Sequence, residues 1–81
     1  MSTLEELDQT WRGRVTDPGY AALLRELDDL GCTFEWREEN GEIIFLARCG
    51  EEVVGESNDQ PAQSAIYAVL DQAAEKLDVL A

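Results

Sequence analysis

The stretch CTFEWREENGEIIFLARC, residues 32 to 49, decides the fold, because its pattern is that of a β-hairpin. Asn40-Gly41 lies at its centre between two runs of β-forming residues, and both central residues of a type I′ turn must tolerate positive φ. If these two residues are the whole loop, Cys32 faces Cys49 and Trp36 faces Phe45. The stretch therefore predicts two antiparallel strands in one defined register.

Alternation along the two strands separates an apolar face from a mixed face. The apolar face, which we expect to join the core, consists of Cys32, Phe34, Trp36, Phe45, Ala47 and Cys49. A non-hydrogen-bonded pair brings Cα atoms to about 4.5 Å, which is within the range of a disulfide between Cys32 and Cys49. Such a disulfide and a pair of reduced, buried thiols are both compatible with the sequence, and mass measurement before and after reduction distinguishes them.

A helix is predicted between residues 17 and 31. Asp17-Pro18 supplies an N-cap residue and a proline for the first helical position, and Gly31 suits the left-handed residue that follows a helix. The apolar stripe between them consists of Tyr20, Leu23, Leu24, Leu27 and Leu30.

A shorter helix is expected at residues 2–11, capped by Ser2 and Thr3, with one apolar face formed by Leu4, Leu7 and Trp11. We expect this face to pack on its own domain in preference to acting as a docking arm, because a segment with a tryptophan and two leucines seldom stays free. Residues 12–14 then form a linker.

A third strand is predicted at residues 52–56, after a second tight turn at Gly50-Glu51. The expected register places Val54 opposite Ala47 on the core face and Val53 on the mixed face.

The last helix is expected near Pro61, with its cap supplied by the loop at residues 57–60. Its buried stripe is predicted to consist of Ala62, Ala65, Ile66, Val69, Leu70, Ala73, Leu77 and Leu80. Tyr67 falls off this stripe, and we expect it either to be exposed or to pack against Trp11.

Together these elements predict an α+β fold, a single two-layer domain in which a three-stranded antiparallel meander of order 1-2-3 packs on two helices. The α-β-β-β-α domain covers residues 17–81, and the short N-terminal helix and its linker cover residues 1–16. A chain of 81 residues has room for one core.

The charge balance restricts the partners. Eighteen acidic residues against six basic ones give a formal charge of −12, which repels a phosphate backbone and disfavours direct binding of nucleic acid. No segment has the length and apolar character of a signal peptide or a membrane span. We therefore expect a cytoplasmic protein with no membrane partner.

The sequence contains few of the residue types on which catalytic sites depend. The chain has no histidine, so the commonest general base and the commonest transition-metal ligand are missing. Two cysteines alone cannot complete a zinc site, and there is no calcium loop or glycine-rich phosphate loop. Carboxylate pairs such as Glu38-Glu39 and Glu51-Glu52 could do acid–base work in principle, but they lie beside turns that we expect to be exposed, which favours a solvated surface over a catalytic role. We expect a non-enzyme without cofactor or metal.

Two resemblances bear on function. The order helix, three strands, helix resembles that of double-stranded RNA-binding domains, but the stretch SNDQPAQ, residues 57–63, has none of the lysines with which those domains bind phosphates. The chain is more similar to small phage proteins with a phage ABA sandwich domain. The similar segments are the helix and strand at residues 24–36, the turn and strand at residues 40–48, and the ending PAQSAIYAVL at residues 61–70. This resemblance implies a phage or prophage origin and no catalytic residues.

Three explanations of the acidity follow. In the first, the protein inhibits a host nucleic-acid-binding defence complex of the anti-CRISPR or anti-restriction type by acting as a DNA mimic, and its partner carries a basic nucleic-acid-binding surface. The acidic edge expected to bind consists of Glu38, Glu39, Glu42, Glu51, Glu52, Glu56 and Asp59.

In the second explanation, the acidity reflects solubility or halophilic adaptation alone. In the third, the chain is a generic interaction module, monomeric or homodimeric, that binds through the mixed sheet face. That face consists of Ile44, Leu46 and Val53 with the flanking Arg37 and Arg48.

Overall fold

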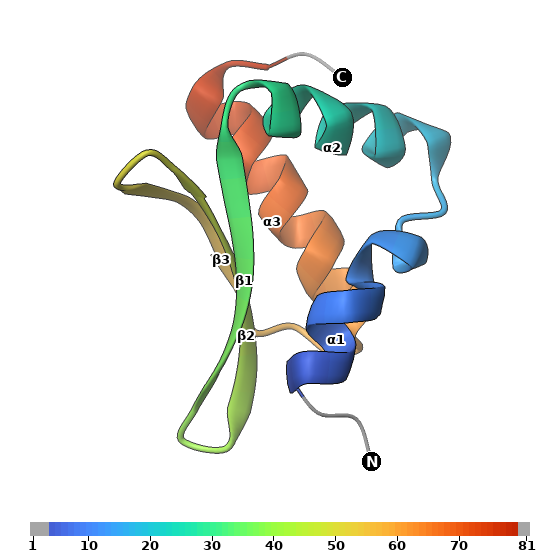
Figure 1. Ribbon diagram of the computed structural model, residues 1–81, viewed down its shortest axis with the longest axis vertical. Coiled ribbons are helices and arrows are strands. Elements are labelled where there is room, and N and C mark those ends of the chain that lie inside the picture. Colours follow the sequence, from blue (N-terminus) through green and yellow to red (C-terminus); the bar gives the residue numbers. More distant parts are fainter. Residues whose placement is uncertain (1–3, 80–81) are drawn as a thin grey trace.

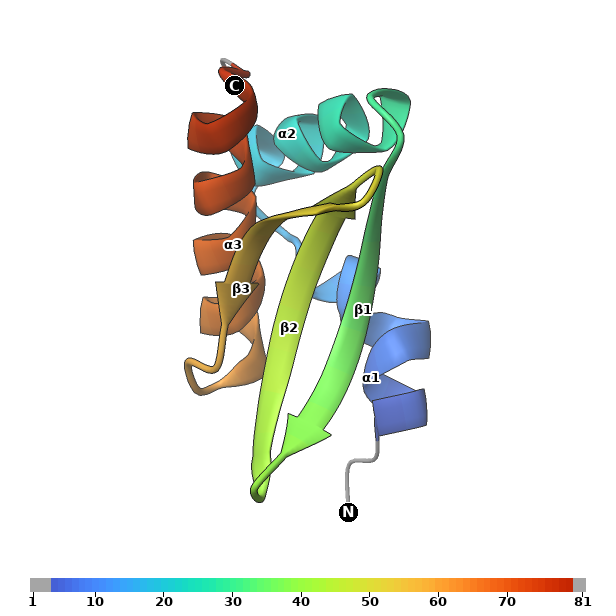
Figure 2. The ribbon, with the colours of Figure 1, turned by 90° about the vertical axis from the view of Figure 1, so that its left-hand side faces the viewer.

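The computed structural model describes residues 4–79. Along the chain the elements are α1 (Leu4–Thr10), the 3₁₀ helix η1 (Trp11–Arg14), α2 (Pro18–Asp29), β1 (Cys32–Glu39), β2 (Glu42–Cys49), β3 (Glu52–Ser57) and α3 (Ala62–Leu77). The three strands form an antiparallel sheet of order β1-β2-β3. The helices of the described residues lie against one face of the sheet (Figure 1), and within residues 4–79 the opposite face carries no helix (Figure 2). The predicted α+β architecture is confirmed.

The hairpin that organises the sheet has the predicted register throughout. Cys32 faces Cys49 and Trp36 faces Phe45. Asn40 and Gly41 have φ angles of 52° and 81°, as a two-residue type I′ turn requires. The local turn chemistry is therefore sufficient to set the pairing of β1 with β2.

The pairing of β2 with β3 differs from the prediction. The expected register holds where Arg48 faces Val53, but a β-bulge follows, and Ala47 faces Gly55 in place of Val54. The bulge turns both Val54 and Gly55 into the core. Gly55 is needed there because a Cβ at this position would lie 2.7 Å from the carbonyl oxygen of Val69 on α3. The close approach of α3 thus explains why position 55 is a glycine.

Helix α2 begins and ends as predicted. Asp17 is the N-cap, and its carboxylate accepts hydrogen bonds from the N–H groups of Gly19 and Tyr20. Gly31 follows the helix with a φ of 87°. Leu30 was wrongly expected in the buried stripe; it is 50% exposed, because it occupies the C-cap where the chain leaves the helix.

Helix α3 buries its predicted stripe from Ala65 to Ala73 and keeps Ala62 and Leu77 partly buried. The loop does not cap it as expected. Pro61 is itself the N-cap residue, and no side chain bonds to the first turn. The predicted burial of Leu80 falls outside the described residues.

The N-terminal segment shares the core of the sheet, as expected. Leu7 and Trp11 are buried, and the Trp11 ring lies 5.1 Å from that of Phe34 and 4.8 Å from that of Phe45. Residues 12–14, predicted as a linker, belong to the 3₁₀ helix η1. The expected caps, Ser2 and Thr3, lie outside the described residues.

Tyr67 links α3 to the start of α2 and does not pack against Trp11. Its ring stacks on that of Tyr20 at 4.3 Å, and its hydroxyl accepts hydrogen bonds from the N–H groups of Thr16 and Asp17. Hydrogen bonding by Thr16 lowers the pKa of Tyr67 from its ordinary value. The Tyr20 hydroxyl donates to Asp71 at 2.9 Å, and this hydrogen bond raises the pKa of Tyr20.

Candidate partner-binding site

The predicted acidic edge is not one surface. The β1–β2 turn precedes Glu42 and the β2–β3 turn follows Cys49, so the two acidic turns lie at opposite ends of β2 (Figure 2). A strand of eight residues separates its ends by about 23 Å at roughly 3.3 Å per residue. Glu51 and Glu52 therefore lie far from the turn at Asn40-Gly41. The expectation of a single cluster was wrong, because a meander sends consecutive turns to opposite ends of the sheet.

The first turn keeps three of the seven predicted carboxylates, and the loop before α3 adds a fourth. Asn58 donates a hydrogen bond of 2.7 Å to Glu42, which brings the loop before α3 against the tip of the hairpin. We call the resulting group the hairpin-tip carboxylates; it consists of Glu38, Glu39, Glu42 and Asp59, all exposed. Glu56 lies apart from them, opposite Leu46 in the middle of the sheet.

The cations that form ion pairs bind carboxylates outside the hairpin-tip group. Among residues 4–79 the ion pairs join Arg12 to Asp28, Arg37 and Arg48 to Glu35, and Lys76 to Glu52. None of these pairs involves a hairpin-tip carboxylate. Glu52, at the other turn, is partly compensated by Lys76 at 3.6 Å. Within residues 4–79 the hairpin-tip carboxylates are therefore a group of negative charges without an ion-pair partner.

The mixed sheet face offers less apolar surface than predicted. Leu46 was expected to be exposed, but only 2% of it is accessible. Glu35 and Glu56 face it from the two neighbouring strands, and Glu35 pairs with Arg37 at 3.1 Å and with Arg48 at 3.6 Å. Long charged side chains cover apolar surface with their stems. The prediction of an exposed Leu46 was wrong. The alternating pattern shows which face of the sheet a residue occupies, but it does not show how far neighbouring side chains cover that residue.

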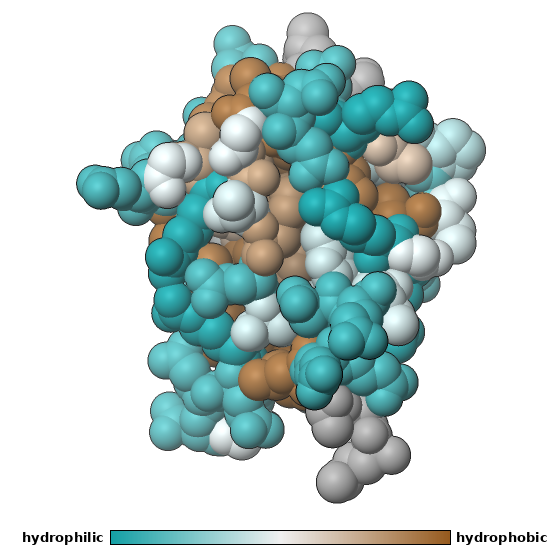
Figure 3. Space-filling model, in the orientation of Figure 1, coloured by the Kyte–Doolittle hydropathy of each residue, from teal (hydrophilic) through white to brown (hydrophobic). Residues whose placement is uncertain are grey.

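Two apolar residues of that face remain accessible, Val53 with 43% exposure and the half-buried Ile44. Figure 3, in which this sheet face is seen only from its edge, shows hydrophilic residues over much of the surface with smaller hydrophobic areas between them. Scattered apolar residues of this kind are normal on a protein surface and do not define an interface.

The free edge of β3 is closed by α3. Gln72 accepts a hydrogen bond from the N–H of Glu56 and donates one to its carbonyl oxygen, both at 3.0 Å. At Glu56 the side-chain amide thus makes the two backbone hydrogen bonds that a neighbouring strand would make. Because open edges invite pairing between copies, this arrangement opposes self-association through β3.

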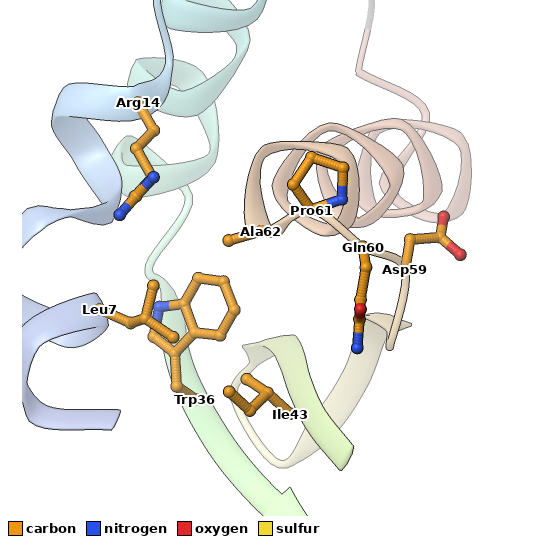
Figure 4. A pocket seen from close by; sticks show the side chains of 8 residues that line it. All are labelled: Leu7, Arg14, Trp36, Ile43, Asp59, Gln60, Pro61 and Ala62. Carbon is orange, nitrogen blue, oxygen red and sulfur yellow. The ribbon is translucent and has the colours of Figure 1, made fainter. Parts of the chain in front are cut away.

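A pocket opens beside the hairpin tip and was not predicted from the sequence. It has a volume of about 370 Å³, and Trp36, Ile43 and Pro61 contribute apolar surface (Figure 4). Arg14 lies on one side of it and Asp59 on another. The lining comes from three segments distant along the chain, at residues 7–14, 36–43 and 59–62, and no local pattern in the sequence indicates that they meet.

Trp36 lies in the core as predicted, with 8% exposure, but its indole N–H has no hydrogen-bond partner within residues 4–79. Figure 4 shows the nitrogen on the side of the ring near Leu7, with the six-membered ring toward the pocket. A buried donor without an acceptor costs about 1–3 kcal/mol of folding free energy. The Trp36 N–H is therefore a cost to the fold that packing of the ring must offset.

The cysteines are free thiols in the structure, and the possible disulfide between them stays a prediction. Burial, together with a hydrogen bond to Cys49, raises the pKa of the Cys32 thiol to about 11. No group of three or more potential metal ligands occurs within residues 4–79. No helix in that range is long and apolar enough to cross a bilayer.

Comparison of the chain with protein-family models, with curated proteins and with solved structures finds no match. The resemblance to the phage ABA sandwich domain therefore stays a prediction, and the functional argument depends on the surface of this chain alone.

Proposed function

We propose that the protein binds a partner with a basic nucleic-acid-binding surface and that the hairpin-tip carboxylates occupy this surface as a DNA mimic. The expected partner is a host defence complex of the anti-restriction or anti-CRISPR type, which the protein inhibits. The observation that carries the proposal is the group Glu38, Glu39, Glu42 and Asp59, which has no cation within ion-pair distance inside the described residues.

Electrostatics supports such a partner. Carboxylates that are already ion-paired must give up a partner before they can bind another cation, whereas the hairpin-tip carboxylates give up none. A net charge of −12 also steers a cationic surface toward the protein and raises the rate of association. Both effects weaken with added salt, because the Debye length falls to about 10 Å at 0.1 M ionic strength.

The mixed-face module has less support, since Leu46 is covered and the edge of β3 is closed. Adaptation of the whole surface to salt or solubility remains as the alternative explanation of the acidity. It differs from the proposal in one testable respect: it assigns no special role to the hairpin tip.

The test is a pull-down from bacterial lysate with elution by rising salt, comparing two variants of equal charge change. Glu38→Lys with Glu39→Lys alters the hairpin tip. Glu26→Lys with Glu51→Lys alters exposed carboxylates that have no ion pair in the structure and lie away from the tip. We expect the first variant to bind the captured protein about tenfold more weakly or worse and the second to bind nearly as well as the wild type.

Competition with double-stranded DNA for the captured protein is the second measurement, and we expect mutual exclusion. Equal weakening by the two variants would assign the effect to total charge. Binding that is unaffected by the hairpin-tip changes, or that persists with DNA present, would show that the protein is not a mimic acting through this site.

A further inference from the structure

The two cysteines lie opposite each other at the end of the sheet beside the C-terminus of α2. Cys32 is the first residue of β1 and Cys49 is the last residue of β2, and the register pairs them directly. We propose that Cys49 is a thiol modification site that exchanges with a low-molecular-weight disulfide, and that Cys32 then converts the product into an intramolecular disulfide. The proposal goes beyond the proposed function, because neither cysteine belongs to the hairpin tip.

The backbone places the two thiols at a separation that a disulfide can span. Alternate facing pairs of an antiparallel hairpin exchange backbone hydrogen bonds, and counting from the two-residue turn makes Cys32–Cys49 a pair that does not. Cα atoms in such a pair lie about 4.5 Å apart, inside the range of about 4.4–6.8 Å that disulfides span. Both side chains are on the core face, where Cys32 is part of the core and Cys49 packs against it. A disulfide can therefore form without a change of register.

The two thiols differ in their access to a reagent. Cys32 is 6% exposed, whereas Cys49 is half-buried. Burial raises the pKa of the Cys32 thiol to about 11, so this thiol stays protonated at neutral pH. The Cys49 thiol makes only a weak hydrogen bond, in which it donates to the carbonyl oxygen of Leu30 at 3.9 Å. Because the nucleophile is an accessible thiolate, Cys49 is the cysteine that an external disulfide meets first.

The reaction consists of two exchange steps. The Cys49 thiolate attacks one sulfur of the external disulfide, a bond forms between these two sulfurs, and one half of the reagent leaves as a thiolate. Cys32 then attacks the Cys49 sulfur, its proton passes to the second leaving sulfur, and the remaining half of the reagent leaves as a thiol. Both cysteines are thereby oxidised, and the external disulfide is reduced to two thiols. The facing position of Cys32 makes the second step intramolecular, so the mixed disulfide does not accumulate.

The charge of the protein restricts the kind of disulfide that reacts. Glu51 and Glu52 closely follow Cys49 in the chain, and the formal charge of −12 repels an anionic reagent. The nearest ion pair, between Lys76 and Glu52, leaves Glu51 uncompensated within residues 4–79. A neutral disulfide avoids this repulsion, so 2-hydroxyethyl disulfide is the probe.

The test treats the folded protein with 2-hydroxyethyl disulfide, quenches the reaction with acid and measures the intact mass. We expect the wild type to lose two hydrogen atoms and to carry no adduct. Cys32→Ala should keep one mercaptoethanol group, because no second thiol resolves the mixed disulfide. Cys49→Ala should stay largely unmodified, because the remaining thiol is buried and protonated.

A second measurement needs no substitution and so does not depend on how the variants fold. Brief alkylation of the wild type with iodoacetamide, followed by peptide mapping, compares the two thiols within one protein. We expect Cys49 to react about tenfold faster than Cys32 or more. In concentrated urea the two rates should become similar, which assigns the difference to the fold.

Several outcomes would overturn the proposal. A wild-type protein that does not react, or that keeps a stable adduct in place of the intramolecular disulfide, would show that Cys32 does not resolve the product. Alkylation of Cys32 at the rate of Cys49 in the folded protein would show that Cys49 is not the site of attack.

Discussion

Replacement of Gly55 by alanine tests the packing of α3 on the sheet, which holds one wall of the pocket in place. The added Cβ would lie 2.7 Å from the carbonyl oxygen of Val69, 3.1 Å from Val69 Cγ1 and 3.4 Å from Gln72 Cβ. The nearest of these atoms belongs to the backbone of a helix and cannot rotate away. Relief of the clash therefore requires α3 to move away from β3.

The magnitude follows from opposing contributions. Replacing the glycine lowers the conformational entropy of the unfolded chain, which stabilises the folded protein by about 0.5–1 kcal/mol. Burial of one methyl group stabilises it by about 0.8 kcal/mol more. Overpacking costs about 1–3 kcal/mol. Movement of α3 also weakens the two bonds between Gln72 and Glu56, each of which contributes about 0.5–1.5 kcal/mol. The net expectation is a destabilisation of about 2 kcal/mol.

Urea denaturation followed by tryptophan fluorescence measures this change, because Trp11 and Trp36 are both buried. Gly13→Ala is the matched control, since a Cβ at Gly13 meets no atom within 4 Å. We expect Gly13→Ala to change the free energy of unfolding by less than about 0.5 kcal/mol. A Gly55→Ala protein as stable as the wild type would refute the argument that α3 approaches β3 too closely for a side chain.

Two further predictions concern the helix contacts. Gln72→Ala removes both hydrogen bonds to the edge of β3, so we expect the free energy of unfolding, measured by urea denaturation, to fall by about 1–2 kcal/mol. We also expect the variant to self-associate in sedimentation equilibrium, because the edge is open. A monomer of unchanged stability would contradict the role of Gln72. The two tyrosines should titrate in two steps of absorbance at 295 nm, Tyr67 below and Tyr20 above the ordinary pKa of 10.0, and a single step would contradict this. The raised pKa of Tyr20 implies stability that is fully present below about pH 10 and is lost as the pH rises through that pKa.

The candidate site was predicted only in part. The acidic turn at Asn40-Gly41 and the core position of Trp36 follow from the sequence, because a turn motif and a two-residue alternation are local signals. The separation of the two acidic turns was missed although the sequence allows its prediction, since a meander with a strand as long as β2 places them far apart. The pocket could not be predicted, because the angle at which α1 and α3 meet the sheet determines whether Arg14 and Asp59 line the same cavity.

The sequence by itself determined the order of the elements, the register of the hairpin and the ends of α2, because each depends on residues adjacent along the chain. Only the tertiary structure decided the bulge at Val54-Gly55, the cover over Leu46 and the pocket beside the hairpin tip. Each of these depends on how closely elements distant in sequence approach one another. Such distances are set by the packing of the whole core, where an added methyl group or a charged stem changes which surface remains accessible.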